Sequence, residues 1–181
     1  MPPRQFACLG ASHEDFKMSK ELRAAATAVL DACRARGLKV ATAESCTGGL
    51  VAGALTDIAG SSDVLDRGFV TYSNEAKQQM LGVPADILRD HGAVSRQTAE
   101  AMARGSLGRA TADLVVAITG IAGPGGGNAD KPVGLVHFAA AARDGALTHA
   151  EKRYGDIGRA EVRHKSVLQA LAMLKEIAER R

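Results

Sequence analysis

A serine and two glycines lie within residues 43–49, where an expected strand turns into an expected helix. Gly48 and Gly49 allow a ligand to approach the backbone closely, and the first N–H groups of the helix have no partner within it. Such groups, here those of Thr47 to Gly49, can hold a phosphate or the oxyanion of an acyl-transfer intermediate. A hydroxyl just ahead of them is placed as a nucleophile would be. The pattern predicts a nucleophilic Ser45 and a substrate contact along Thr47, Gly48 and Gly49.

Two other interpretations of this turn stay open. The turn lacks the GxSxG pattern, and Ser45 or Thr47 could serve only to cap the helix. Cys46 is a rival and intrinsically stronger nucleophile, although free cysteines more often pack as small apolar residues. Neither candidate has an evident histidine base. The histidines in other sequence contexts are expected to be structural or at the surface: His91, His137, His149 and His164.

A tyrosine and a lysine lie within residues 69–77, where a second strand is expected to lead into a helix. Strand ends of this kind are where open α/β sheets bind ligands. A serine without a histidine can use a lysine as its base if burial or a neighbouring charge makes that lysine neutral. Tyr72 could orient Lys77 or relay its proton. The alternative is a solvated Lys77 and a core ring at Tyr72, unless both meet Ser45 in space.

A glycine-rich loop, residues 120–127, follows the apolar run at residues 114–118. Its glycines suit a close approach to a ribose or a phosphate. The Gly-Lys-Ser/Thr ending of a Walker loop is absent, and no helix follows as in a dinucleotide-binding fingerprint. No group of His, Cys and Asp residues has the spacing of a metal site. We therefore expect a substrate-binding loop, and neither a metal nor a cofactor.

Alternating strands and helices are expected to position these residues. Strands are expected over residues 39–43, 67–72, 114–118, 133–141 and 147–154. Helices are expected from Ser19 to Arg36, over residues 47–58, over residues 74–80 with Asn74 as cap, from Ser95 to beyond Leu107, and over residues 158–179. The buried face of the first helix is expected to carry Leu22, Ala26, Val29, Leu30 and Cys33. The run 114–118 is apolar throughout, as in a strand that is buried on both faces.

This alternation predicts an α/β protein with three α/β/α layers. Back-to-back strands within residues 133–154 indicate a hairpin, so we expect a mixed, mostly parallel sheet. Residues 1–17 show no periodicity and are expected to form a loose N-terminal leader. Residues 18–181 are long enough for a single domain with one core.

Composition narrows the functional class. The chain has 23 basic and 20 acidic residues, a formal charge of +3, and no tryptophan. This balance argues against a nucleic-acid partner, for which a clustered basic stripe is expected. No apolar run is long enough for a membrane span. Three scattered cysteines, Cys8, Cys33 and Cys46, indicate reduced thiols and a cytoplasmic location.

Six segments, taken in order, resemble the CinA C-terminal domain family. They are residues 43–49, 59–62, 68–77, 91–95, 119–124 and 131–134, and the resemblance extends over about residues 18–180. It implies a three-layer α/β/α fold with a mixed sheet. It also implies a bacterial enzyme of the stand-alone type, which hydrolyses nicotinamide mononucleotide to nicotinic acid mononucleotide and ammonia without a metal.

The resemblance also implies roles for individual residues. The catalytic positions of the family fall on Ser45, Tyr72 and Lys77. Its motif threonine falls on Thr119, next to Gly120 of the glycine-rich loop. A family arginine that follows a Gly-Asp pair falls on Arg159, with Arg163 as the second choice, because residues 155–159 read Gly-Asp-Ile-Gly-Arg with two residues more than usual. With the glycine-rich loop, this arginine would hold the phosphate and the ribose.

A second class of function stays open from the sequence. The same pocket could bind a pyridine nucleotide for regulation, without turning it over. A nucleic-acid partner is suggested only by the competence and damage naming of the family, and the near-neutral charge argues against it. A homo-oligomer is compatible with the sequence, which does not fix the oligomeric state.

Overall fold

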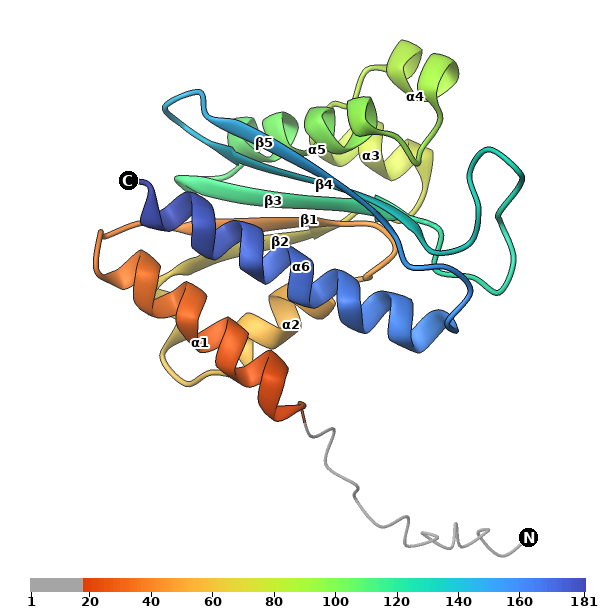
Figure 1. The fold of residues 1–181 in the computed structure, drawn as a ribbon. Helices are drawn as coiled ribbons and strands as arrows, with labels where there is room; N and C mark the ends of the chain where they lie inside the picture. Colours follow the sequence, from red (N-terminus) through yellow and green to blue (C-terminus); the bar gives the residue numbers. More distant parts are fainter. Residues whose placement is uncertain (1–17) are drawn as a thin grey trace, which may run out of the picture.

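The computed structural model describes residues 18–181, which form one sheet with helices on both of its faces (Figure 1). The strands are β1 (Val40–Glu44), β2 (Leu65–Val70), β3 (Leu114–Gly120), β4 (Leu135–Ala142) and β5 (Leu147–Arg153). The helices are α1 (Lys20–Arg34), α2 (Leu50–Thr56), α3 (Asn74–Leu81), α4 (Ala85–His91), α5 (Arg96–Arg109) and α6 (Arg159–Glu179), with a short 3-10 helix η1 (Ser61–Asp63). Helices α1, α2 and α6 lie on one face of the sheet, and α3, α4 and α5 lie on the other.

The sheet has five strands in the order β2-β1-β3-β4-β5. Strand β1 pairs in parallel with β2 and with β3, whereas β3 with β4 and β4 with β5 are antiparallel. The predicted three-layer fold and mixed sheet are confirmed, although the pairings divide evenly instead of being mostly parallel. Because β1, β2 and β3 run in parallel, their carboxyl ends share one edge, where ligands bind in sheets of this kind.

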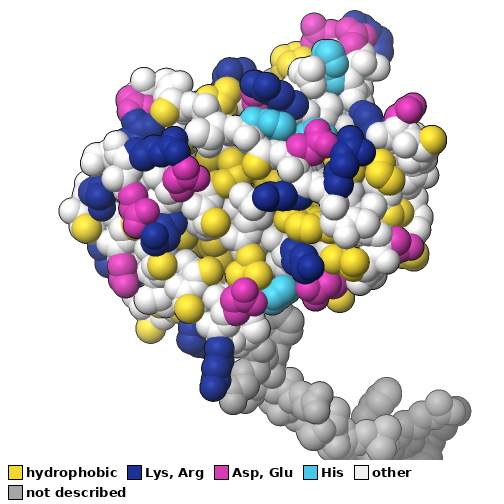
Figure 2. All heavy atoms as spheres, viewed as in Figure 1, with side chains coloured by type: hydrophobic (Ala, Val, Ile, Leu, Met, Phe, Trp, Pro, Cys, Tyr) yellow, Lys and Arg dark blue, Asp and Glu magenta, His cyan; other side chains and the backbone are white. Residues whose placement is uncertain are grey.

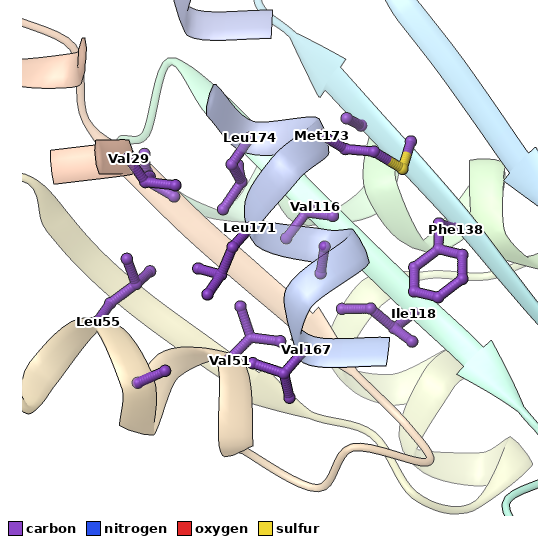
Figure 3. Close-up of a cluster of buried hydrophobic side chains, with 14 of the residues drawn as sticks. Val29, Val51, Leu55, Val116, Ile118, Phe138, Val167, Leu171, Met173 and Leu174 are labelled. Atoms are coloured by element: carbon purple, nitrogen blue, oxygen red, sulfur yellow. The ribbon is translucent and has the colours of Figure 1, made fainter. Parts of the chain in front are cut away.

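An apolar core lies between α6 and the sheet (Figure 3). Side chains from α1, α2 and α6 meet those of β3 and β4: Val29, Val51, Leu55, Val116, Ile118, Phe138, Val167, Leu171, Met173 and Leu174. Helix α1 begins where the Ser19 hydroxyl accepts a hydrogen bond from the N–H of Leu22, and most of its predicted inner face is buried. Strand β3 is buried on both faces, as its apolar run predicted.

Three local predictions need correction. Helix α2 begins at Leu50 rather than Thr47, because Gly48 and Gly49 adopt positive φ angles of 61° and 97° that an α-helix cannot use. Ser73 caps α3 in place of Asn74, by accepting from the N–H of Ala76 at 3.0 Å. Helix α4 and η1 were not predicted. The leader expected at residues 1–17 lies outside the described residues.

The surface carries charges of both signs. On the face in Figure 2, basic and acidic side chains are interspersed, with apolar side chains between them. Within residues 18–181, no helix is both long and apolar enough to cross a membrane.

Candidate active site

The carboxyl ends of β1 and β2 bring three predicted residues to one edge of the sheet. Ser45 directly follows β1, Tyr72 follows β2, and Lys77 lies in the N-terminal half of α3. The N–H of Thr71 donates to the carbonyl of Glu44 at 2.8 Å, so the parallel pairing of the two strands continues up to the site. Ser45 and Lys77, which are 32 positions apart in the sequence, therefore lie next to each other.

Lys77 is buried against Ser45. Only 1% of Lys77 is exposed, and its Nζ lies 3.1 Å from the Oγ of Ser45. The same Nζ donates to the carbonyl of Thr71 at 2.9 Å and approaches that of Tyr72 at 3.5 Å. Within residues 18–181 no carboxylate forms a salt bridge with Lys77. The alternative of a solvated helix lysine is therefore wrong.

This environment favours the neutral form of the lysine. Burial lowers the pKa of Lys77 below its usual value of 10.5, since removal from water penalises the ammonium. A neutral amine has two N–H groups, which the carbonyls of Thr71 and Tyr72 can accept, and one lone pair. That lone pair can accept the hydroxyl hydrogen of Ser45. The arrangement is suited to a lysine that removes a proton from a serine.

Cys46, the rival nucleophile, is in a different environment. It is 5% exposed, and burial raises the pKa of its thiol to about 12. The reactive form of a cysteine is the thiolate, which such a thiol does not supply near neutral pH. Cys46 instead packs in the apolar cluster on the α6 side of the sheet.

The N-terminus of α2 differs from the predicted oxyanion site. The carboxylate of Glu44 accepts the N–H of Gly49 at 3.0 Å, and Gly48 donates its N–H to the carbonyl of Ser45 at 3.1 Å. Of the three predicted donors, only the N–H of Thr47 has no partner among residues 18–181, and the N–H of Cys46 has none either. The expectation that Gly48 and Gly49 offer free donors is wrong, because both are already used within the turn.

Tyr72 points away from the lysine. The residue is 60% exposed, so the alternative of a core ring is wrong. Its hydroxyl accepts a hydrogen bond from Nη2 of Arg159 at 2.9 Å, and only its backbone carbonyl approaches Lys77. Nη1 of Arg159 donates to the carbonyl of Gly123 at 3.1 Å. Arg159 thus joins the end of β2 to the glycine-rich loop, and the predicted contact of the Tyr72 hydroxyl with Lys77 is not present.

The structure also places Arg163, Thr119 and Gly120, the other residues that were expected to bind substrate. Nη2 of Arg163 donates to the carbonyl of Thr47 at 2.9 Å, which places Arg163 beneath the serine turn. The hydroxyl of Thr119 is buried and donates to the carbonyl of Ala93 at 2.7 Å. A side chain at Gly120 would lie within 3 Å of β4, so this glycine is explained by close strand packing.

Three of the described histidines have side-chain partners away from Ser45. Nδ1 of His137 lies 3.1 Å from Nε2 of His149, and burial lowers the pKa of both rings. Nε2 of His164 lies 3.7 Å from a carboxylate oxygen of Glu21. Among residues 18–181, no histidine hydrogen bonds to Ser45, and no three His, Cys, Asp or Glu side chains are grouped as metal ligands.

Two cavities among the described residues do not include the contact between Ser45 and Lys77. One, of about 690 Å³, lies between α1, α2 and α6 and is lined by Arg163 among mainly apolar residues. The other, of about 410 Å³, lies between α4, α5 and the β4–β5 hairpin and is lined by His137 and Lys131. Neither is lined by Ser45 or Lys77. The chemical contact therefore lies outside both cavities, at the edge of the sheet.

A model of the CinA C-terminal domain family matches residues 22–178. The chain belongs to the CinA C-terminal domain family. In Escherichia coli K12, the nicotinamide-nucleotide amidohydrolase PncC is 53% identical over 155 residues, which cover 85% of this chain and 93% of that protein.

Solved structures of the family share the fold. The crystal structure of the competence/damage inducible protein CihA from Agrobacterium tumefaciens is 57% identical and has a TM-score of 0.87, covering 91% of this chain and 99% of that one. Other members are longer. A putative competence-damage inducible protein of Caldicellulosiruptor bescii is 48% identical over 77% of this chain, which spans only 33% of that relative.

One residue of the site was missed by the sequence argument. Glu44 is fully buried, and its carboxylate accepts the N–H groups of Gly49, Val51 and Ala52. The available signal was an acidic residue just before a glycine turn into a helix, because carboxylates are favoured at helix N-termini. Glu44 was not predicted because the polar side chains considered at this turn were Ser45, Cys46 and Thr47, all of which follow it.

Proposed function

We propose that this protein is a nicotinamide-nucleotide amidohydrolase, which converts nicotinamide mononucleotide to nicotinic acid mononucleotide and ammonia. The observation that carries the proposal is the buried contact of 3.1 Å between Nζ of Lys77 and Oγ of Ser45. The E. coli relative, a nicotinamide-nucleotide amidohydrolase that is 53% identical over 93% of its length, supports the choice of substrate. A serine activated by a neutral amine is a chemistry suited to breaking an amide bond.

Acylation begins with proton transfer. The neutral amine of Lys77 takes the hydroxyl proton of Ser45, and Oγ forms a bond to the carboxamide carbon of the pyridine ring. The carbonyl oxygen then carries a negative charge. The N–H groups of Cys46 and Thr47 are the backbone donors left at this turn, and we assign them to the oxyanion.

Collapse of the tetrahedral intermediate releases ammonia. The carbon–nitrogen bond breaks, and the ammonium of Lys77 gives its proton to the departing NH2 group. The result is an ester between the nicotinoyl group and Ser45. A water molecule then attacks the ester carbon while the amine of Lys77 takes one of its protons, and this proton returns to Oγ of Ser45 when the acyl–oxygen bond breaks.

The phosphate of the nucleotide needs a binding residue other than those that act on the carboxamide. Arg159 carries no salt bridge among residues 18–181, and its hydrogen bonds to Tyr72 and Gly123 hold it at the rim of the site. A guanidinium in this place is suited to a phosphate, because it can donate two parallel hydrogen bonds. We assign the nucleotide phosphate to Arg159 and the ribose to the glycine-rich loop.

The proposal is tested by measuring ammonia release from purified protein. Nicotinamide mononucleotide, nicotinamide and NAD are compared side by side, with Ser45→Ala as the inactive control. We expect release from the mononucleotide, little from nicotinamide, and none with Ser45→Ala. The assay is repeated after dialysis against a chelator, which should leave the rate unchanged.

The regulatory alternative predicts a different result. A binding module would bind nicotinamide mononucleotide, as measured by calorimetry, and release no ammonia. Binding without ammonia release by the wild-type protein would therefore overturn the enzymatic proposal. Release of ammonia at equal rates with Ser45→Ala would overturn the serine mechanism.

A further inference from the structure

The carboxylate of Glu44 lies under the serine turn and is enclosed by hydrogen-bond donors. Oε2 accepts the N–H groups of Gly49 and Val51, both at 3.0 Å. Oε1 accepts the N–H of Ala52 at 2.9 Å and the hydroxyl of Thr42 at 3.1 Å. Every one of these donors belongs to β1 or to the start of α2, so Glu44 ties the strand to the helix.

The serine turn is fixed from a second direction by α6. Nη2 of Arg163 donates to the carbonyl of Thr47 at 2.9 Å, and the N–H of Ser45 donates to the carbonyl of Ile118 at 3.0 Å. The turn between β1 and α2 is therefore held at its beginning, middle and end. Only Gly48 and Gly49, at positive φ, allow the chain to close so tightly.

We infer that Glu44 and Arg163 are positioning residues for Ser45, which hold the turn so that the serine hydroxyl stays against Lys77. The inference rests on the proposed function, because it requires Ser45 to be the nucleophile. Among the described residues, neither side chain forms a hydrogen bond with Lys77 or with the hydroxyl of Ser45. Both act through the backbone of the turn, which also carries the N–H groups of Cys46 and Thr47.

The hydrogen bonds of Glu44 also affect where the substrate phosphate can bind. Helix N-termini commonly bind phosphates through their free N–H groups. At α2 the carboxylate of Glu44 already accepts the N–H groups of Gly49, Val51 and Ala52, so these donors are not available to a phosphate. The phosphate is thereby directed away from α2, and Arg163, which faces the carbonyl of Thr47, is assigned to the turn instead of the substrate.

The test for Glu44 uses its closest isostere. In Glu44→Gln, either orientation of the amide places its NH2 group against at least one backbone N–H, so the turn loses part of its anchor. We expect kcat for nicotinamide mononucleotide to fall about tenfold to a hundredfold, because small misplacements of a reacting group have effects of this size. KM should change by less than about threefold, because the phosphate is held elsewhere.

A matched control separates positioning from stability. The carboxylate of Asp113 accepts the N–H of Lys39 at 2.7 Å, at the opposite end of β1 from Ser45. Asp113→Asn should lower the melting temperature and leave kcat unchanged at temperatures well below it. If Glu44→Gln behaves in the same way, with reduced stability and normal kcat, the inference is wrong.

Arg163 supplies a second test if Glu44→Gln does not fold. Arg163→Met should lower kcat about tenfold, and Arg163→Lys, which can still donate to the carbonyl of Thr47, should recover much of it. A raised KM with normal kcat in Arg163→Met would mean that Arg163 binds substrate. That result would overturn the inference for this residue.

Failure of the inference can be distinguished from failure of the proposed function. Phenylmethylsulfonyl fluoride forms a sulfonyl ester with an activated serine and releases fluoride, and mass spectrometry locates the label. We expect rapid labelling of Ser45 in the wild type, slower labelling in Glu44→Gln, and none in Ser45→Ala. Labelling of the wild type without ammonia release would reject the substrate but keep the inference. Equal labelling of wild type and Glu44→Gln, or none in either, would reject the inference.

Discussion

The hydroxyl of Tyr72 accepts a hydrogen bond from Arg159 at 2.9 Å, while Lys77 is reached only by the backbone carbonyl of the tyrosine. The side chain is therefore placed to align an arginine and not to relay a proton. In Tyr72→Phe the arginine loses one partner and keeps the carbonyl of Gly123. We expect KM for nicotinamide mononucleotide to rise about threefold to tenfold with kcat little changed. Steady-state kinetics check this, and a large loss of kcat at constant KM would restore the relay.

Arg159 should act on the phosphate alone. A charge-assisted hydrogen bond contributes roughly 1.5–3 kcal/mol, which corresponds to about tenfold to a hundredfold in affinity. Arg159→Met is therefore expected to raise KM for the mononucleotide by this factor. The rate with the riboside, which has no phosphate, should be low in the wild type and unchanged by the substitution. An equal loss with both substrates would argue against a phosphate clamp.

Cys46 should be dispensable for chemistry. Burial raises the pKa of its thiol to about 12, so almost none of it is thiolate near neutral pH. Cys46→Ala is expected to retain most of the turnover, apart from a modest loss of stability from the small cavity that it leaves. Iodoacetamide at neutral pH should likewise leave the wild-type rate unchanged. A loss of activity in Cys46→Ala like that in Ser45→Ala would identify the thiol as the nucleophile.

The burial of Lys77 should lower the stability of the protein. Its folded-state pKa lies below 10.5, so between that pKa and 10.5 the unfolded chain binds more protons than the folded one, and this lysine's contribution to stability rises with pH. Lys77→Met removes the buried amine. We expect its melting temperature near pH 7 to rise on the order of 2–4 °C, which is about 1 kcal/mol for a chain of this length.

The control for this prediction is an exposed lysine. Lys152 lies at the surface of the edge strand β5. Lys152→Met should leave the melting temperature nearly unchanged, which separates loss of a buried amine from loss of a positive charge. A lower melting temperature in Lys77→Met than in the wild type would show that the hydrogen bonds of Nζ outweigh its desolvation.

The part of the site that lies at the ends of the parallel strands could be predicted from the sequence. Ser45 and Lys77 each come after an expected strand, over residues 39–43 and 67–72, and neighbouring parallel strands end at one edge of a sheet. Their meeting was therefore predictable once β1 and β2 were paired. Helix α4 was missed because it is short and its N-cap residue, Pro84, supplies no side-chain hydrogen bond, so neither length nor a capping residue indicated it.

Side-chain directions could not be predicted in the same way. Tyr72 and Arg159 are 87 positions apart, and no local pattern indicates that the hydroxyl turns to the arginine instead of the nearby lysine. Which backbone N–H groups donate to the carboxylate of Glu44 likewise depends on the residue at which α2 begins. That start is set by the positive φ angles of Gly48 and Gly49, which the sequence permits but does not require.

The pH dependence of kcat/KM tests most directly whether Lys77 is the base. In the wild type, kcat/KM for nicotinamide mononucleotide should rise with pH and level off above a pKa that lies below 10.5, because only the neutral amine can take the proton of Ser45. Lys77→Arg should bind the nucleotide, lose about a hundredfold or more in kcat/KM, and show no such rise, because a guanidinium remains charged. Near-normal turnover in Lys77→Arg, or the same pH profile in both proteins, would contradict the account.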